Sequence, residues 1–190
     1  MRIFFTATYE GQKDFGKYYK LLYKELELLG YSHLDDEAIS ITYEEYVNHM
    51  AKNRDARVSN YQQKMKYIQD ADICVIESSA HSLGNGFIVQ KSLESAKPTV
   101  VLYYKDNTPF FLSGVEDEKL IVASYNDKNY SQVLKKTLDM AREKRDKRFN
   151  FFLSPKLLQY IDDASRERGI TKSKLLRDMI VKHMRGANEV

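Results

Sequence analysis

The segment Ser-Leu-Gly-Asn-Gly-Phe at residues 82–87 has the composition of a site that binds an oxyanion. A serine hydroxyl can donate a hydrogen bond, and glycine has no side chain to keep backbone amides away from a ligand. The residues that follow have helical spacing, and the amides and dipole at the start of a helix attract negative charge. We therefore predict that Ser82, Gly84, Asn85 and Gly86 bind a phosphate-like group. The alternative is a glycine-rich turn without a ligand.

Side chains that could act as acids, bases or nucleophiles lie close to this segment. Asp72 and Glu77 flank the apolar run that precedes it, and Asp72 is expected to brace a strand. His81 could act as a base and Ser79 as a nucleophile. However, they are two residues apart in a loop with no evident acid to orient the histidine. Glu77 is therefore the fallback catalytic carboxylate.

The composition excludes several classes of site. The 190 residues include one cysteine and four scattered histidines, so no internal disulfide and no metal-ligand spacing is expected. No apolar run reaches the roughly 18 residues that a membrane span needs, and the first residues do not resemble a signal peptide. Cys74 lies in an apolar run, as a small hydrophobic residue would. We expect a cytoplasmic protein with no cofactor, no metal and no membrane contact.

Hydrophobic periodicity predicts alternating strands and helices. Runs rich in β-branched and aromatic residues predict strands at 2–8, 71–78, 99–104 and 120–125. Apolar residues at three- and four-residue intervals predict helices at 15–29, 42–69, 83–96 and 130–144. Gly30 is expected to end the first helix, Thr42 and Glu45 to form a capping box, and the polar residues 52–60 to interrupt the second helix. This pattern favours an open parallel α/β sheet with helices on both faces.

The last 40 or so residues have a different pattern. A β-like segment at 148–153 precedes a helix from Pro155 to about Gly169, and a second helix follows with Thr171 as N-cap. A module this small cannot bury its own apolar faces, so it needs a second copy. The sequence therefore predicts three parts: an α/β domain at 1–141, a basic linker at 142–147 and a helical module at 148–186.

This module resembles the ribbon-helix-helix family of DNA-binding dimers, through its "FNFFLS" ribbon, its "GITKS" turn and the apolar spacing of its helices. The resemblance implies that two ribbons pair and enter the major groove of DNA. Because side chains alternate along a strand, those of Arg148, Asn150 and Phe152 would then point toward base edges. The start of the second helix would clamp a phosphate through Thr171, Lys172 and Ser173. The alternative is a dimerisation module that never touches DNA.

The first 140 or so residues resemble the nucleoside 2-deoxyribosyltransferase superfamily, and most of all its deoxynucleoside 5′-monophosphate N-glycosidases. The resemblance lies in "RIFFTATYEG", "DADICVIESSAHSLGNGF" and "AKPTVVLYY", which occur in the family's order and at its intervals. It implies a flavodoxin-like doubly wound sheet with a nucleotide or nucleoside at the carboxyl ends of the strands. The resemblance implies that the ligand site also includes Phe4, Thr6 and Thr8. It further implies that Glu77 is a ligand of the ribose.

The residues that the family uses for catalysis are replaced in this chain. The family's glutamate nucleophile corresponds to Ile88, and its aspartate before the central strand corresponds to Lys64. Its first-strand tyrosine corresponds to Phe4, and its basic residue after that strand aligns near Glu10. Because isoleucine can neither attack an anomeric carbon nor stabilise an oxocarbenium ion, the sequence predicts an inactive site.

These observations lead to one hypothesis and two alternatives. The hypothesis is a DNA-binding regulator, a homodimer or homotetramer, whose catalytically inactive domain senses a nucleotide or nucleoside. The first alternative is an active deoxyribosyltransferase or nucleotide N-glycosidase that uses Glu77 or another acid. The second is an accessory protein that assembles partners in a nucleotide-targeting defence system or a toxin–antitoxin pair.

Overall fold

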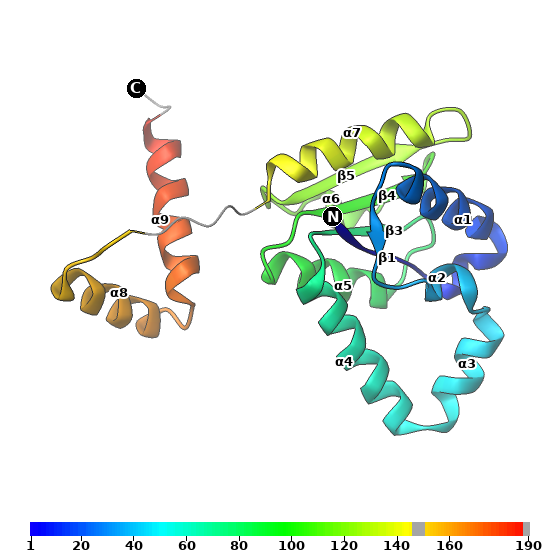
Figure 1. The fold of residues 1–190 in the computed structure, drawn as a ribbon, viewed down its shortest axis with the longest axis horizontal. Coiled ribbons are helices and arrows are strands. Elements are labelled where there is room, and N and C mark those ends of the chain that lie inside the picture. The colour runs from blue at the N-terminus through cyan, green and yellow to red at the C-terminus, as the bar shows by residue number, and fades with distance from the viewer. Residues whose placement is uncertain (146–150, 188–190) are drawn as a thin grey trace. The chain divides into compact units, whose positions relative to one another are not determined.

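The computed structural model describes residues 1–145 and 151–187 (Figure 1). Contacts along the chain divide it into two compact units, Met1–Asp146 and Lys147–Val190. None of the described helices combines the length and the apolar character that a membrane span requires.

The first unit contains a five-stranded sheet in which all paired strands are parallel. In chain order the strands are β1 Arg2–Ala7, β2 Ser32–His33, β3 Ile73–Glu77, β4 Thr99–Tyr104 and β5 Leu120–Tyr125. Their spatial order is β2-β1-β3-β4-β5, the order of flavodoxin-like doubly wound sheets. The predicted parallel α/β sheet is confirmed. The short β2 is missing from the sequence prediction, because two residues carry no periodic signal.

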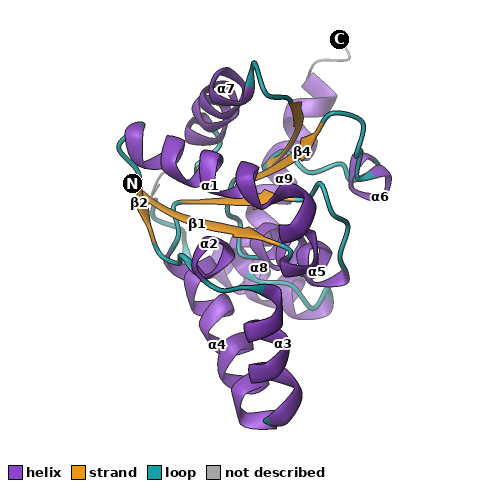
Figure 2. Ribbon diagram, turned by 90° about the vertical axis from the view of Figure 1, so that its right-hand side faces the viewer, coloured by secondary structure: helices purple, strands orange, loops and turns teal. Residues whose placement is uncertain are grey.

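Helices connect the strands and cover both faces of the sheet (Figures 1 and 2). In chain order they are α1 Gln12–Leu28, α2 Glu37–Ser40, α3 Tyr43–Lys52, α4 Arg54–Asp70, α5 Leu83–Glu94, α6 Phe110–Ser113 and α7 Tyr130–Glu143, and a 3₁₀ turn, η1 Tyr9–Gly11, precedes α1. Helices α3 and α4 form a hairpin that extends beyond the sheet (Figure 2).

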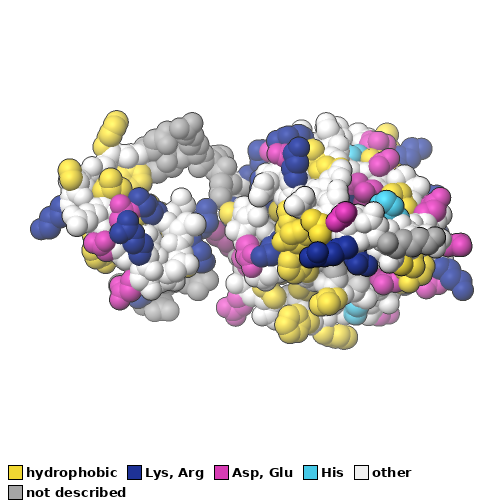
Figure 3. Space-filling model, turned by 90° about the horizontal axis from the view of Figure 1, so that it is seen from below, with side chains coloured by type: hydrophobic (Ala, Val, Ile, Leu, Met, Phe, Trp, Pro, Cys, Tyr) yellow, Lys and Arg dark blue, Asp and Glu magenta, His cyan; other side chains and the backbone are white. Residues whose placement is uncertain are grey.

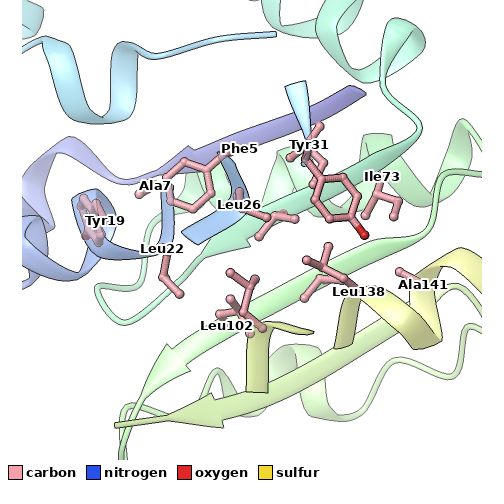
Figure 4. Close-up of a cluster of buried hydrophobic side chains, with 14 of the residues drawn as sticks. Phe5, Ala7, Tyr19, Leu22, Leu26, Tyr31, Ile73, Leu102, Leu138 and Ala141 are labelled. Atoms are coloured by element: carbon pink, nitrogen blue, oxygen red, sulfur yellow. The ribbon is translucent and has the colours of Figure 1, made fainter. Parts of the chain in front are cut away.

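Each face of the sheet has its own hydrophobic core. One core joins β1, β3, β4 and β5 to α1 and α7, and several of its side chains are labelled in Figure 4. The other core packs Phe4, Cys74 and Ile76 against α4 and α5. Alternate residues of β1 and β3 therefore enter different cores, as the two-residue period of a strand requires. The strands carry almost continuous apolar runs for this reason.

Local signals in the sequence set the helix boundaries. Thr42 and Glu45 form the predicted capping box, in which Glu45 N donates to Thr42 Oγ1 at 3.2 Å and Thr42 N donates to Glu45 Oε2 at 2.8 Å. The predicted interruption within 52–60 occurs at Asn53, whose side chain caps α4. After α1, Gly30 has a φ of +82°, a conformation that favours glycine.

The described residues of the second unit, 151–187, contain two helices, α8 Pro155–Glu167 and α9 Lys172–Ala187, joined through Gly169 at a φ of +62°. Both predicted helices are confirmed. Apolar side chains remain exposed on each helix, including Leu157, Tyr160, Ile180 and Met184. In Figure 3 the more extended hydrophobic patches lie on the first unit, and the second unit shows smaller groups of hydrophobic side chains among charged ones.

The predicted β-ribbon is not part of the described structure. Residues 151–154 form no strand, and 148–150 lie outside the described residues. A ribbon strand needs a second strand to accept and donate its backbone hydrogen bonds, and a single chain does not supply that strand. The β-α-α prediction is therefore corrected to a helical unit.

Candidate ligand site at the carboxyl ends of the strands

A cavity of about 490 Å³ opens at the carboxyl ends of β1 and β3. It lies between η1, the α3–α4 hairpin and the first turns of α5. The described residues that line it are Thr6, Ala7, Thr8, Tyr9, Glu10, Tyr46, Met50, Arg57, Asn60, Tyr61, Lys64, Met65, Ser82, Leu83, Gly84, Asn85, Phe87 and Ile88. Five of the predicted ligand-binding residues thus share one cavity: Thr6, Thr8, Ser82, Gly84 and Asn85.

The start of α5 gives this cavity an anion-binding end. Ser82 is the N-cap, and its Oγ accepts a hydrogen bond from Asn85 N at 3.1 Å. Its hydroxyl hydrogen therefore remains available for a ligand. The first amides of a helix have no acceptor within the helix, so the N–H groups of Leu83 and Gly84 are directed to the same end. The local structure thus supplies hydrogen-bond donors for an oxyanion, and oxyanion binding by these residues stays a prediction.

Asn85 contributes to this end from a fixed position. Its side chain is buried, and Nδ2 donates to the backbone oxygen of Glu77 at 3.0 Å. The first turn of α5 is thereby attached to the last residue of β3. Asn85 consequently holds the anion-binding turn against the sheet.

Aromatic side chains form two walls of the cavity. Tyr9 of η1 and Tyr46 of α3 stack with their ring centroids 4.0 Å apart and an interplanar angle of 13°. Tyr61 of α4 and Phe87 of α5 form a tilted pair with centroids 6.2 Å apart. Tyr9 is oriented further by its hydroxyl, which donates to Glu37 Oε2 at 3.0 Å. Planar aromatic walls of this kind suit a planar aromatic ligand.

Among the described residues of the lining, two have cationic side chains, and these differ in their surroundings. Lys64 is buried, and its Nζ makes ion pairs with Asp35 and, at 2.6 Å, with Glu37. Burial alone would lower the pKa of Lys64, but the two carboxylates outweigh it and raise this pKa above its ordinary value. Arg57 is exposed, and its Nη1 donates to Met50 O at 3.1 Å. Lys64 is therefore a structural cation, whereas Arg57 is accessible to an anionic ligand.

The cavity has an isoleucine at the predicted nucleophile position and an acid elsewhere. Ile88 lines the cavity from the second turn of α5. Among the described residues of the lining, the only carboxylate belongs to Glu10 of η1. Glu10 Oε2 accepts a hydrogen bond from Thr8 Oγ1 at 2.6 Å. A carboxylate is therefore present, although it comes from a different element than the sequence pattern indicates.

Other predicted ligand residues do not line this cavity. Phe4 is fully buried in the core beneath it, beside the Lys64 ammonium group. Gly86 lines a neighbouring apolar cavity, to which Phe87 also contributes. Glu77 lies on the α1 and α7 face of the sheet, where its carboxylate accepts from Tyr125 Oη at 2.8 Å. The fallback acid is thus directed away from the cavity.

The predicted DNA-contacting residues are only partly described. Arg148 and Asn150 lie outside the described residues, and Phe152 is fully exposed. At the start of α9, Thr171 Oγ1 accepts from Lys174 N at 3.2 Å, as a capping residue does. The Lys172 ammonium group pairs with Asp162, and Ser173 is exposed. A role for these residues in DNA binding remains a prediction.

Sequence reasoning missed the contribution of the α3–α4 hairpin. Arg57, Asn60, Tyr61 and Lys64 recur at helical spacing and face the cavity together. This stripe of polar and aromatic residues on one helix face is a signal that the sequence does contain. Within the described residues, no three histidine, cysteine or acidic side chains come together in a way that could hold a metal ion.

Comparisons with known proteins give similarities among solved structures only. The sequence matches no protein-family profile and no curated protein. Among solved structures, the chain is similar to the CMP N-glycosidase BcmB from Clostridium botulinum, with 17% identity and a TM-score of 0.48. The similarity covers 74% of this chain and 98% of that one.

Proposed function

We propose that the first unit binds a nucleotide, with the phosphate at the start of α5 and the base between the aromatic walls. The observation that carries this proposal is that one cavity combines an anion-binding helix start with two aromatic pairs. A phosphate alone would not need the aromatic walls, and a neutral aromatic ligand would not need the helix start. A nucleoside 5′-monophosphate satisfies both ends.

Calorimetry with the full chain tests this proposal. The probes are the common nucleosides, deoxynucleosides and their 5′-monophosphates. We expect a monophosphate to bind more tightly than its nucleoside. Tyr46→Leu should weaken binding about tenfold, equivalent to about 1.4 kcal/mol of lost stacking. Tyr43→Leu is the matched control, because Tyr43 is exposed on the same helix and does not line the cavity. Absence of binding by every monophosphate would refute the proposal.

A second candidate function is hydrolysis of the N-glycosidic bond in the same cavity. The observation in its favour is the carboxylate of Glu10, which lines the cavity and is oriented by Thr8. A carboxylate can act there as a general acid or can stabilise an oxocarbenium-like transition state. This candidate takes the place of a mechanism through Glu77, whose side chain is directed to the opposite face of the sheet.

Release of free base from the 5′-monophosphates, followed by chromatography, tests the second candidate. Turnover that disappears in Glu10→Gln and persists in Glu44→Gln would establish it, because Glu44 is exposed on α3 outside the lining. Binding without any release of base would leave the unit as a nucleotide-binding domain, in agreement with the isoleucine at position 88.

For the second unit we propose pairing with another copy of the chain, giving a homodimer or homotetramer. Support comes from the apolar side chains that α8 and α9 leave exposed, such as Tyr160 and Ile180. Burial of these faces would remove apolar surface from water, at roughly 25 cal/mol per Å². Sedimentation should show an oligomer that Ile180→Asp dissociates, and a wild-type monomer at micromolar concentration would contradict the pairing.

The regulator hypothesis adds DNA binding to this pairing, and its support is the sequence pattern of 148–173. A gel-shift assay with the promoter region of the chain's own gene tests it. We expect Arg148→Ala with Asn150→Ala to weaken the complex, and unchanged affinity would remove the groove-binding role. Co-purification with another protein in the absence of DNA binding would favour the accessory-protein alternative.

A further inference from the structure

The buried carboxylate of Glu77 has no place in the proposed ligand contacts, yet it occupies the centre of a hydrogen-bond network. The side chain is 0% exposed. Its oxygens accept from the Tyr125 hydroxyl at 2.8 Å, from the Ser79 backbone amide at 3.3 Å and from the Ser79 hydroxyl. A buried charge without a cation is costly, so its presence calls for a physical reason.

This network fixes the loop that leads to the anion-binding end of the cavity. Ser79 Oγ donates to Glu77 and also accepts from Tyr104 N at 2.7 Å, which ties the loop to the end of β4. The backbone oxygen of Glu77 accepts from Asn85 Nδ2 at 3.0 Å, which ties the same residue to the first turn of α5. Ser82 lies between these two attachments.

The loop also supports the opposite wall of the cavity. Ala80 packs so closely against Gly11 that a Cβ on Gly11 would lie 2.6 Å from Ala80 Cβ and 2.3 Å from Tyr19 Oη. Gly11 ends the η1 turn, which carries Tyr9 and Glu10 into the cavity. A displacement of residues 79–80 would therefore move both the anion-binding turn and an aromatic wall.

We propose that Glu77 is a positioning residue, whose ionised carboxylate holds residues 78–82 in the arrangement that binds the ligand's phosphate. This inference rests on the proposed nucleotide-binding function and assigns to Glu77 no contact with the ligand. In the ionised form the carboxylate accepts all three hydrogen bonds from Ser79 and Tyr125. Both hydroxyls donate to Oε1 and the Ser79 amide donates to Oε2. A proton on Oε2 therefore takes the acceptor of the Ser79 amide, and a proton on Oε1 competes with the two hydroxyls, so protonation weakens the attachment of the loop.

The surroundings of Glu77 determine the direction of a pH dependence. Among the described residues, the titratable groups packed against it are Tyr19 of α1 and Tyr125 of β5, and Asp14 lies near Tyr19. The neighbouring strands contribute Ala7 and Leu102, which are uncharged. Burial raises the pKa of Glu77 to about 7, although hydrogen bonds from Ser79 and Tyr125 act to lower it. Affinity for a monophosphate should therefore decrease as the pH falls below 7.

Calorimetry of the tightest-binding 5′-monophosphate between pH 6 and 8 measures this effect. If only the ionised form binds, affinity falls by up to about tenfold for each pH unit below 7. Glu77→Gln should bind about tenfold more weakly than wild type at pH 8. The phosphate of the ligand titrates near pH 6, but both proteins share that contribution. The difference between their pH profiles therefore isolates Glu77, and a His81→Gln variant with the wild-type profile excludes the loop histidine.

A second pair of variants separates this role from general damage to the fold. Tyr125→Phe removes one donor to Glu77 and should weaken binding. Tyr18→Phe is its matched control, because the Tyr18 hydroxyl donates to Asp127 at 2.7 Å, away from the loop. Equal affinity of Glu77→Gln and wild type at pH 8 would overturn the positioning role.

Hydrogen exchange without ligand distinguishes a failure of this inference from a failure of the proposed function. At pH 8 we expect faster amide exchange over residues 78–86 in Glu77→Gln than in wild type, with unchanged exchange in β4. Equal exchange over 78–86 would refute the positioning role, whether or not a nucleotide binds. Faster exchange together with no nucleotide binding in wild type would leave the loop attachment in place and refute the proposed ligand.

Discussion

The contribution of Glu77 to the stability of the first unit is expected to decrease as the pH rises from 4.5 to 7, because this side chain loses its proton inside the core. In the folded chain burial raises the pKa of Glu77 to about 7 from its ordinary value of 4.5. The folded state thus holds this proton more tightly than the unfolded state does. The stabilisation is fully present below pH 4.5 and is lost as the pH rises through 7. The gap between the two pKa values corresponds to about 3 kcal/mol.

Glu77→Gln converts this pH dependence into a difference between two proteins. Glutamine has the shape of the protonated carboxyl and no charge, so the variant should be more stable than wild type by up to about 3 kcal/mol at pH 8. At pH 4.5 the two proteins should agree within about 1 kcal/mol. The positioning role adds an opposite effect on binding. A variant that is more stable and binds more weakly is a combination that simple damage to the core does not produce.

Urea unfolding of the full chain at several pH values measures this difference. Far-UV circular dichroism is a suitable signal, because the chain contains no tryptophan. Hydrogen exchange assigns the transition of the first unit, since a chain with two units need not unfold in one step. Glu44→Gln, at an exposed glutamate, is the control. A stability difference between Glu77→Gln and wild type that stays constant from pH 5 to pH 8 would refute the reasoning.

Three further predictions concern the cavity and its supports. Ile88→Glu places a carboxylate in the cavity and should introduce or raise release of base from a bound monophosphate, as chromatography would show. Lys64→Met leaves Asp35 buried without its cation and should cost about 3–5 kcal/mol in urea unfolding, with partial recovery in the double variant with Asp35→Asn. Gly11→Ala places a methyl group 2.3 Å from the nearest side-chain atom. It should destabilise by about 1–3 kcal/mol, whereas Gly16→Ala in α1 should stabilise by about 0.5–1 kcal/mol.

The sequence predicts those elements whose boundaries are set by local chemistry. The strands at 99–104 and 120–125 match β4 and β5 residue for residue, since both are apolar runs next to turn-forming residues. Thr42 and Gly30 set helix ends through their own side-chain and backbone preferences. The elements that sequence reasoning missed, η1, β2, α2 and α6, have two to four residues each, too few to show a period.

The helix start at Ser82 was predictable for the same reason, and the aromatic walls of the cavity were not. The serine cap and the glycines act within one turn, so their spacing is visible in the sequence. Tyr9 and Tyr46 meet only because the α3–α4 hairpin returns toward η1, a tertiary arrangement that no local pattern specifies. The orientation of Glu77 was predictable from the strand pattern, although the sequence analysis did not use it. The two-residue period from Val75 places it on the α1 and α7 face, so the strand pattern already contained this result.

The position of Glu10 shows why one substituted motif residue does not decide whether the cavity is catalytic. Sequence reasoning compared Ile88 with a glutamate at the same place in a motif and predicted an inactive site. A reacting group is defined by its distance from the ligand, and residues far apart in the chain can supply it. Here η1, some 70–80 residues before Ile88, brings a carboxylate into the same cavity. Base release by wild type and by Glu10→Gln therefore tests activity directly, and Ile88→Glu tests whether the motif position has kept its geometry.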